Sequence, residues 1–275
     1  MSNLLRRTVF GTVFVALVVA ATLHRTLFLC IFLAFMVQML REFYVLTIGD
    51  GIKYRRSCAI LSAILLFPLV YLYAEGLVGA EFVSLAWVPV IALMMSAVCL
   101  KDKSNLEPLA YLLAGLVYIA LPLSLSPLLV FRGGEFDGTL LLSFFIIIWC
   151  GDVGAYALGT AFGQKPTSRK LCPEISPKKS WIGVFGGYVT ALAGVLVLHA
   201  CGFLSFGIGH CIVLATLLNL GGVFGDLFES MWKRRKNVKD SGSILPGHGG
   251  VLDRLDSSLI AMPLGAIYLA VAGLL

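Results

Sequence analysis

Residues whose side chains could bind a metal ion and phosphate groups gather in one stretch of the chain, residues 225–257. In its first part, polar side chains recur at intervals of three and four residues, which would place them on one face of a helix. These residues are Asp226, Glu229, Ser230 and Lys233. In its last part the same spacing joins Asp253, Asp256 and Ser257. The stretch therefore predicts two helix ends that carry carboxylates.

A loop rich in glycine and basic residues separates the two predicted helix ends. Residues 246–250 read Pro-Gly-His-Gly-Gly, a sequence that cannot continue a helix. Its glycines allow backbone N–H groups to approach a ligand closely. Carboxylates beside such a loop suit a divalent metal ion bound to a polyphosphate.

Each of these features also has a simpler interpretation. A cluster of Lys and Arg after an apolar segment is commonly a topology anchor that attracts anionic lipid. The Gly-His-Gly-Gly sequence is more often a turn than a phosphate-binding loop, and it lacks the Lys-Ser/Thr pair of a P-loop. Asp253 and Asp256 could simply stabilise a helix start through its dipole. The chemical interpretation depends on all these residues occurring together at fixed spacing.

The composition indicates a membrane protein. Of the 275 residues, 59% are hydrophobic and only 13% are charged, whereas about 25% of residues are charged in soluble domains. The mean hydropathy is +0.94. The seven cysteines include no C-x-x-C pair, so they favour small packing residues over a disulfide framework or a zinc site. The net charge of +6 follows from basic loops and does not require nucleic acid as a partner.

The apolar segments predict an all-α, polytopic integral membrane protein with about nine transmembrane helices. Each segment is long enough, or nearly so, to cross a hydrocarbon core of about 30 Å. The predicted spans are Thr8–Leu23, Thr26–Leu46, Ser57–Tyr73, Phe82–Leu100, Leu109–Phe131, Thr139–Phe162, Trp181–Cys201, Ile208–Phe228 and Leu255–Leu275. The break at His24-Arg25 is so short that the first two spans must form a hairpin.

The distribution of basic residues predicts the orientation in the membrane. Of the 21 Lys and Arg residues, all but Arg25 and Arg132 fall in alternate loops on one side. By the positive-inside rule this side is the cytoplasm, which makes the N-terminus cytoplasmic and places the C-terminus outside. We therefore expect a multi-pass protein of the inner cell membrane whose active site faces the cytoplasm.

The two halves of the chain predict different roles. Residues 1–138 form spans without buried charge, which we expect to be structural or to face lipid. Residues 132–138, at the end of this half, predict an outer turn. Residues 139–275 hold the polar stretches and are expected to be the catalytic half.

Asp152 lies well inside the predicted span Thr139–Phe162. An ionised carboxylate at such a depth costs about 2.5–3.5 kcal/mol, so it should face the protein interior or a water-filled cavity. It would either form a structural hydrogen bond between helices or line the polar site. Gly151 with Ala155, and Gly159 with Gly163, predict that this helix packs closely on another.

A second polar segment, residues 170–183, precedes the span Trp181–Cys201. It reads Lys-Leu-Cys-Pro-Glu-Ile-Ser-Pro-Lys-Lys-Ser-Trp-Ile-Gly. Prolines and lysines directly before a span are also consistent with a loop that only sets topology.

The two polar segments together resemble the phosphatidate cytidylyltransferase family. The strict part of the resemblance is Ser230-x-x-Lys233-Arg234, then Lys239-Asp240, then Pro246-Gly-His-Gly-Gly-x-x-Asp253-Arg254-x-Asp256. Residues 170–183 are similar to the family's second pattern, K-L-x-P-x-I-S-P-K-K-[ST]-W-x-G. Ile182 occupies a position that is commonly Glu or Gln in the family, which leaves the detailed role of this pattern open. The resemblance extends from about Cys150 to Ser257.

The resemblance implies a nucleotidyl transfer in phospholipid biosynthesis. A phosphate oxygen of phosphatidic acid attacks the α-phosphorus of CTP, which yields CDP-diacylglycerol and pyrophosphate. This nucleophile is already an anion near neutral pH, so no Ser/His/Asp triad is needed. The remaining task is to bring anions together and to stabilise the leaving group, which suits metal ions, Lys and Arg side chains and backbone N–H groups.

The resemblance and the residue chemistry together assign three roles. The predicted metal ligands are Asp226, Asp253 and Asp256. The residues predicted to act in catalysis are Lys233, Arg234, Lys239, Asp240, His248 and Arg254. The residues predicted to bind substrate are Asp152, Ser176, Lys178, Lys179, Ser230, Gly247, Gly249 and Gly250. Hard carboxylate oxygens beside a triphosphate favour Mg²⁺ over zinc, and a second cation is left open.

The expected partners are CTP, phosphatidic acid and the lipid bilayer, and the small-residue faces raise the hypothesis of a homodimer. Two other functions stay open. An ion-coupled transporter would also use intramembrane Asp152 and Asp226 with glycine-broken helices, although the polar residues concentrate on one side of the membrane. A related isoprenoid or lipid phosphate transferase, or a lipid kinase, would use similar carboxylates with another specificity.

Overall fold

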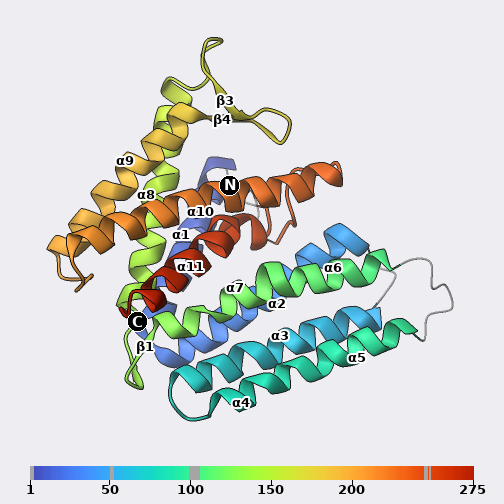
Figure 1. The fold of residues 1–275 in the computed structure, drawn as a ribbon. Helices are drawn as coiled ribbons and strands as arrows, with labels where there is room; N and C mark the ends of the chain where they lie inside the picture. The colour runs from blue at the N-terminus through green and yellow to red at the C-terminus, as the bar shows by residue number, and fades with distance from the viewer. Residues whose placement is uncertain (1–2, 50–52, 99–105, 245–246, 248) are drawn as a thin grey trace. The chain divides into compact units, whose positions relative to one another are not determined.

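The computed structural model of the chain is predominantly helical and describes residues 1–275 except 1–2, 50–52, 99–105, 245–246 and 248 (Figure 1). In the described part, eight helices are long and apolar enough to cross a membrane. They are Arg25–Ile48, Arg56–Ala74, Ala80–Val98, Glu107–Leu129, Thr139–Ala161, Trp181–Ala200, Ile208–Arg235 and Leu252–Val271. The first predicted span is a shorter apolar helix, Thr8–Leu23. The prediction of an all-α polytopic membrane protein is thereby confirmed.

The chain divides into two compact units. Unit 1 comprises Met1–Gly138 and Asp240–Arg254, and unit 2 comprises Thr139–Lys239 and Leu255–Leu275. Residues 240–254, which include the Gly-rich part of the signature, thus group with the first half of the chain. The predicted difference in role between residues 1–138 and 139–275 stays a prediction.

Unit 1 consists of helices and one small hairpin. Its α-helices are α1 (Asn3–Leu23), α2 (Arg25–Ile48), α3 (Lys53–Ala74), α4 (Ala80–Val83), α5 (Trp87–Val98), α6 (Glu107–Gly115) and α7 (Leu121–Ser124). Short turns of other helix types are η1 (Ser84–Ala86), η2 (Leu116–Ala120) and η3 (Ser126–Leu129). The hairpin strands are β1 (Phe131–Arg132) and β2 (Glu135–Phe136).

The helix α2 is central to unit 1, where it packs against α1, α3 and α6. Phe28, Phe32 and Phe43 of this helix are fully buried, as expected for a helix that is apolar on most sides. Tyr44 is also buried, and its hydroxyl donates a hydrogen bond to the carbonyl oxygen of Leu112 in α6 at 2.9 Å. The interior of unit 1 is therefore built around α2.

Two predicted turns of unit 1 are present. Residue His24 leaves the helical conformation between α1 and α2 and accepts a hydrogen bond from the Thr26 backbone on its side chain, which caps α2. At the other turn, β1 and β2 pair in antiparallel register. The intervening Gly133 and Gly134 have φ of 57° and 85°, a conformation that favours glycine in a two-residue hairpin turn.

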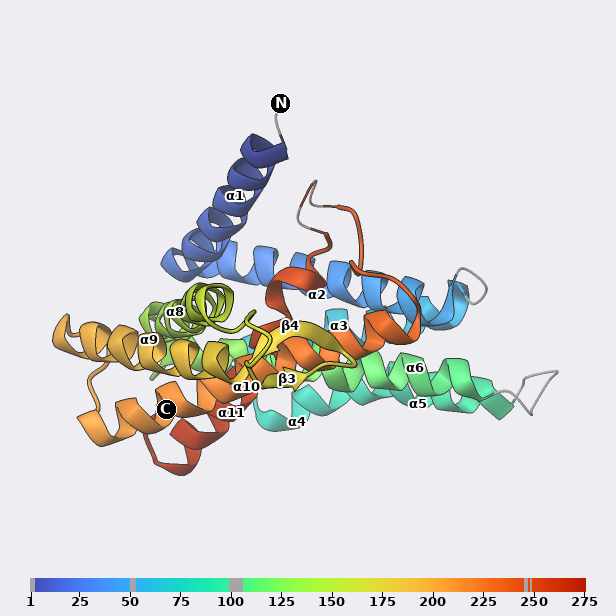
Figure 2. The same cartoon turned by 90° about the horizontal axis from the view of Figure 1, so that it is seen from above.

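Unit 2 contains α8 (Thr139–Ala161), α9 (Trp181–Ala200), α10 (Ile208–Arg235) and most of α11 (Leu252–Val271). In Figures 1 and 2, α8 and α9 run side by side, and α10 packs against both. A hairpin of β3 (Lys170–Cys172) and β4 (Ser176–Ser180) connects α8 to α9. This hairpin was not predicted from the sequence.

Small residues bring α8 and α9 into close contact, which confirms that predicted feature. A Cβ atom on Gly154 would lie 2.6 Å from the carbonyl oxygen of Gly186, and one on Gly186 would lie 2.8 Å from that of Gly154. The Thr190 hydroxyl of α9 donates to the carbonyl oxygen of Cys150 in α8 at 2.7 Å. Backbones can approach this closely only where side chains are absent.

Replacing Gly186 with leucine is expected to destabilise the protein by about 1–3 kcal/mol, because the new side chain must push two backbones apart. Thermal unfolding of the detergent-solubilised protein measures this effect. Gly209→Leu is the matched control, since a Cβ atom at Gly209 in α10 meets no atom within 4 Å. Equal unfolding midpoints for the two variants would contradict the predicted packing role.

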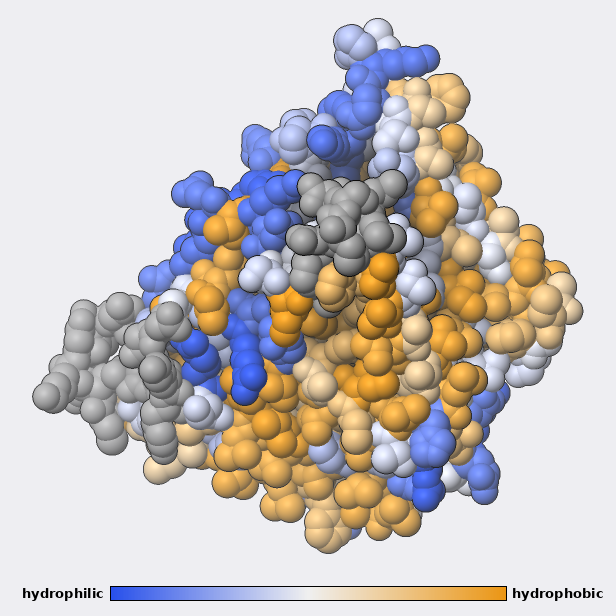
Figure 3. Space-filling view, turned by 180° about the vertical axis from the view of Figure 1, so that it is seen from behind, coloured by the Kyte–Doolittle hydropathy of each residue, from blue (hydrophilic) through white to orange (hydrophobic). Residues whose placement is uncertain are grey.

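The outer surfaces of the helices are largely apolar, as the broad hydrophobic areas in Figure 3 show. On α5, for example, Trp87, Val88, Met95 and Val98 are each at least 60% exposed. Exposed apolar surface on this scale is costly in water and suits the hydrocarbon core of a bilayer.

Candidate active site

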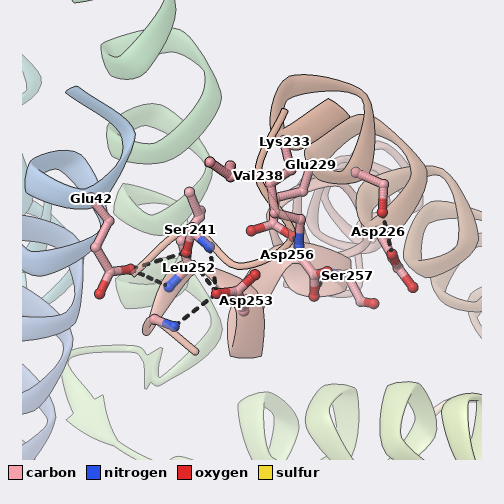
Figure 4. A network of polar contacts seen from close by, with 12 residues as sticks. Glu42, Asp226, Glu229, Lys233, Val238, Ser241, Leu252, Asp253, Asp256 and Ser257 are labelled. Atoms are coloured by element: carbon pink, nitrogen blue, oxygen red, sulfur yellow. Dashed lines mark hydrogen bonds and ion pairs between the residues drawn. The ribbon is translucent and has the colours of Figure 1, made fainter. Parts of the chain in front are cut away.

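Asp226 is the centre of a polar cluster in unit 2. It lies on α10, and its Oδ1 accepts a hydrogen bond from Ser230 Oγ at 3.2 Å, one turn later (Figure 4). Its Oδ2 forms an ion pair with Lys179 Nζ at 2.8 Å. The Asp226 side chain is 40% exposed, so a ligand can reach the carboxylate. The two predicted polar segments, residues 170–183 and 225–257, therefore meet at this ion pair.

Lys179 is held in place by the β3–β4 hairpin. The Gln164 side chain donates to the carbonyl oxygen of Lys178 at 2.8 Å. At the end of β4, Ser180 caps α9 by accepting a hydrogen bond from the Gly183 backbone at 3.2 Å. A serine at this position satisfies a backbone N–H that the helix start leaves without a helical partner. The hairpin thus fixes the lysine relative to the start of α9.

Arg234 ties the hairpin to the end of α10. Its Nε donates to the carbonyl oxygen of Ile175 at 3.3 Å, in the turn between β3 and β4. Its Nη1 donates to the carbonyl oxygen of Val238 at 3.0 Å. The structure therefore gives Arg234 a positioning role, and its predicted action in catalysis stays a prediction.

Lys233 forms a buried ion pair within α10. Its Nζ donates to Oε2 of Glu229, one turn earlier, and the two side chains are only 10% and 1% exposed. Such a pair satisfies the charge of each partner in a medium where an unpaired charge is costly. The Lys233 ammonium is thus bound to a carboxylate in this structure, and its predicted catalytic role stays a prediction.

Asp256 and Asp152 add two more carboxylates to unit 2. Asp256 lies on α11 one turn after Asp253, as its spacing predicted, and it is within electrostatic range of Asp226, Lys233 and Asp152. Asp152 is exposed on α8, so it is not enclosed among packed helices. Its predicted role in binding substrate stays a prediction.

The close approach of α10 to the start of α11 in unit 2 depends on Gly225. A Cβ atom on Gly225 would lie 3.0 Å from the Cα atom of Ser257. The Asp256 carboxylate accepts a hydrogen bond from the Ser257 backbone at 2.8 Å (Figure 4). The glycine thus permits the helix contact that keeps Asp256 and Asp226 within electrostatic range.

The carboxylates of Asp226 and Asp256 in unit 2 offer oxygen donors of the kind that Mg²⁺ takes from proteins. Among the described residues, no group of three or more His, Cys, Asp or Glu side chains could hold a metal ion. Protein-bound Mg²⁺ commonly has only one or two carboxylate ligands and completes its shell with water and substrate phosphates. Asp226 already holds a cation, the Lys179 ammonium. Together with Asp256, it has the donor chemistry that Mg²⁺ requires.

In unit 1, Asp253 organises the loop before α11. Its Oδ2 accepts hydrogen bonds from the backbone N–H and the hydroxyl of Ser241, both at 2.8 Å. The same oxygen accepts a third from the Gly250 backbone at 2.7 Å. Because this oxygen already has three donors, the structure assigns Asp253 a loop-organising role. Its function as a metal ligand stays a prediction.

Two glycines of the loop are explained by their backbone conformation, and one of them also by close packing. Gly247 and Gly249 both have φ of 81°, a left-handed conformation that favours glycine. A Cβ atom on Gly249 would also lie 3.3 Å from the Cβ atom of Asp240. Pro246 and His248 lie outside the described residues. The predicted role of His248 therefore stays a prediction.

The remaining predicted site residues are at or near the surface. Ser176 is half-buried in β4. Four charged residues are exposed, and they are Lys178 and Lys239 in unit 2 and Asp240 and Arg254 in unit 1. Exposed Lys and Arg side chains can bind anionic ligands without the cost of burying them unpaired.

One expectation about the first half was wrong. Residues 1–138 were expected to hold no buried charge, yet Glu42 of α2 is only 6% exposed. Its carboxylate accepts hydrogen bonds from the backbone N–H groups of Val251 and Leu252. The signal in the sequence was an acidic residue inside a predicted span. The pairing of Glu229 with Lys233 was likewise not predicted from the sequence.

The fold and the site together define an integral membrane protein whose carboxylate and lysine cluster suits a phosphate-bearing ligand. Comparison with known proteins gives the family. The chain belongs to the Cytidylyltransferase family, whose model matches residues 5–272. The resemblance inferred from the two polar segments is thereby confirmed.

The similar proteins include several bacterial phosphatidate cytidylyltransferases. That of Bacillus subtilis is 34% identical over 199 residues, which cover 72% of this chain and 71% of the relative. That of Haemophilus influenzae is 48% identical over 128 residues, 45% of this chain and 43% of the relative. That of Pseudomonas aeruginosa is 44% identical over 139 residues, 49% of this chain and 48% of the relative. The last two alignments thus span less than half the length of those relatives.

Proposed function

We propose that the protein transfers a cytidylyl group from CTP to phosphatidic acid, which forms CDP-diacylglycerol and pyrophosphate in phospholipid biosynthesis. The structural observation that carries this proposal is the ion pair of Lys179 and Asp226 at 2.8 Å. This ion pair joins the lysine-bearing β3–β4 hairpin to the helix α10, which carries Asp226. It occurs in a membrane protein of the Cytidylyltransferase family. Family membership gives no support to the ion-coupled transporter or the lipid kinase considered above.

The chemistry of the proposed reaction requires the neutralisation of several anions. The phosphate of phosphatidic acid is already ionised, so its oxygen attacks the α-phosphorus of CTP without a general base. The P–O bond to the pyrophosphate then breaks, and pyrophosphate leaves with its electron pair. Exposed Lys178, Lys239 and Arg254 can bind the phosphates of the two substrates, which stabilises the charge that develops on the leaving group.

Asp226 and Asp256 are proposed to hold Mg²⁺. When bound, the ion would neutralise phosphate oxygens and orient the leaving group. Ser230, which donates to Asp226 at 3.2 Å, would orient this carboxylate. The Lys179 ammonium would then pair with a phosphate oxygen and no longer with Asp226.

The location of the proposed site follows from the basic loops. The excess of Lys and Arg on one side supports an inner-membrane protein whose site faces the cytoplasm, where CTP is made available. The acyl chains of phosphatidic acid would stay in the bilayer while its phosphate reaches the polar residues. A homodimer remains a hypothesis that rests on the small-residue helix faces.

The proposal is tested with the detergent-purified protein, labelled CTP, phosphatidic acid and Mg²⁺. We expect lipid-linked cytidine to accumulate, and we expect EDTA to abolish the product and added Mg²⁺ to restore it. Parallel reactions with ATP, UTP and dCTP establish nucleotide specificity. Absence of lipid-linked cytidine from the wild-type reaction would reject the proposed function, and product formation in EDTA would reject the metal assignment alone.

A further inference from the structure

In unit 1, the buried carboxylate of Glu42 binds the segment that carries the family signature. Glu42 lies on α2 and is 6% exposed. Its Oε1 accepts hydrogen bonds from the backbone N–H of Val251 at 3.0 Å and from Gln38 Nε2 at 2.9 Å. Its Oε2 accepts from the backbone N–H of Leu252 at 2.8 Å and lies 3.5 Å from Ser241 Oγ. Figure 4 shows the carboxylate directed at Ser241 and Leu252.

The position of these donors explains why a carboxylate is tolerated in the interior. Val251 and Leu252 are at the start of α11, where backbone N–H groups have no partner within the helix. A helix N-terminus also carries a partial positive charge that stabilises an anion. Glu42 therefore supplies, from a different helix, the cap that α11 would otherwise need from its own sequence.

Two glycines allow the segment to pass close to this carboxylate. A Cβ atom on Gly242 would lie 3.0 Å from Oε1 of Glu42, and one on Gly250 would collide with Oε2. Gly250 thus has no side chain because Glu42 occupies that space. This is a role for Gly250 besides its predicted contact with substrate phosphate.

Ser241 extends the network from Glu42 to the predicted site. Its hydroxyl lies 3.5 Å from Glu42 Oε2 and 2.8 Å from Asp253 Oδ2. Its backbone N–H donates to the same Asp253 oxygen at 2.8 Å. Asp253 also accepts from the Gly250 backbone, next to Val251, whose N–H binds Glu42. Displacement of Glu42 would therefore disturb both Asp253 and Arg254 through the start of α11.

We propose that Glu42 is a positioning residue for the reaction: it fixes the start of α11 and thereby the placement of Asp253 and Arg254. This inference rests on the proposed function, because it assigns those two residues a part in cytidylyl transfer. Glu42 acts through backbone groups of the signature segment, to which its buried carboxylate is hydrogen-bonded. Small displacements of reacting groups are sufficient to cost about 100-fold in rate.

The test compares Glu42→Gln with Glu75→Gln in the full-length protein. Glu42→Gln keeps the shape of the side chain but presents an amide to backbone donors. We expect kcat to fall by about 100-fold while the KM for CTP changes much less, because Lys178 and Lys239, which are also proposed to bind phosphate, stay in place. Glu75 is the matched control: it is a half-buried carboxylate of unit 1 that is paired with Arg25, and its replacement should leave kcat unchanged. Glu42→Asp, which retains the carboxylate on a shorter side chain, should give an intermediate kcat.

Amide hydrogen exchange separates positioning from a general loss of structure. In Glu42→Gln we expect faster exchange in residues 240–254 and unchanged exchange in α8 and α9. A wild-type kcat in Glu42→Gln, or an equal loss of protection in every helix, would overturn the inference. If the wild-type protein fails to transfer cytidylate, the proposed function falls. Even then, faster amide exchange in Glu42→Gln that is confined to residues 240–254 would support the anchoring of this segment by Glu42. Unchanged exchange in these residues would overturn the anchoring.

Discussion

Asp226→Asn is expected to lower kcat for CDP-diacylglycerol formation by about 1,000-fold, equivalent to about 4 kcal/mol of transition-state stabilisation. The asparagine keeps the size of the side chain and can still accept the hydrogen bond from Ser230. It removes the negative charge that pairs with Lys179 and that we propose holds Mg²⁺. Initial rates of lipid-linked cytidine formation at saturating CTP and Mg²⁺ measure the effect.

The matched control for this variant is Glu174→Gln. Glu174 is an exposed carboxylate in the turn of the β3–β4 hairpin, so its neutralisation changes the net charge of unit 2 by the same amount. Its kcat should equal that of the wild type. If Asp226→Asn retained wild-type kcat and the same Mg²⁺ dependence, Asp226 would not be a metal ligand.

Lys233→Met is expected to destabilise the protein by about 3–5 kcal/mol, because it removes the ammonium that pairs with the buried carboxylate of Glu229. The side chain of Glu229 is only 1% exposed, so water cannot replace the ammonium. The double replacement Lys233→Met with Glu229→Met should recover most of the lost stability, since a buried ion pair is commonly exchangeable for apolar side chains. Urea or thermal unfolding in detergent measures both effects.

Activity of the double variant decides what Lys233 does beyond its ion pair. We expect a stable protein with severely reduced cytidylyl transfer, because the predicted catalytic charge is absent. Recovery of both stability and activity would restrict Lys233 to a structural role. Arg25→Met is the matched control, since Arg25 is 63% exposed in its ion pair with Glu75 and exposed pairs contribute about 0–1 kcal/mol.

The membrane-spanning helices and the polar face of α10 could be predicted from the sequence because both depend on local patterns. An apolar segment of sufficient length specifies a span without reference to the rest of the chain. The spacing of Asp226, Ser230 and Lys233 specifies a shared helix face for the same reason. The helix α10 is present as expected, and the Ser230 to Asp226 hydrogen bond shows that two of these residues meet.

The unpredicted features depend on contacts between residues far apart in the chain. Glu42 lies 210 positions before Leu252, and nothing near either residue indicates that they meet. The partner of Lys179 was likewise hidden, because a lysine before a span serves equally well as a topology anchor. The β3–β4 hairpin escaped prediction because its prolines and lysines are unfavourable for strands. Its backbone is stabilised by Gln164 and Arg234, which lie outside it.

The grouping of residues 240–254 with the first half of the chain limits how far this protein can be dissected. A fragment that begins at Thr139 would contain both polar segments that carry the family signature. It would nevertheless lack Glu42, and the first turn of its last helix would have lost two hydrogen-bond acceptor oxygens. The signature and the residues that stabilise it therefore have different borders here, and the catalytic pattern is not a portable module.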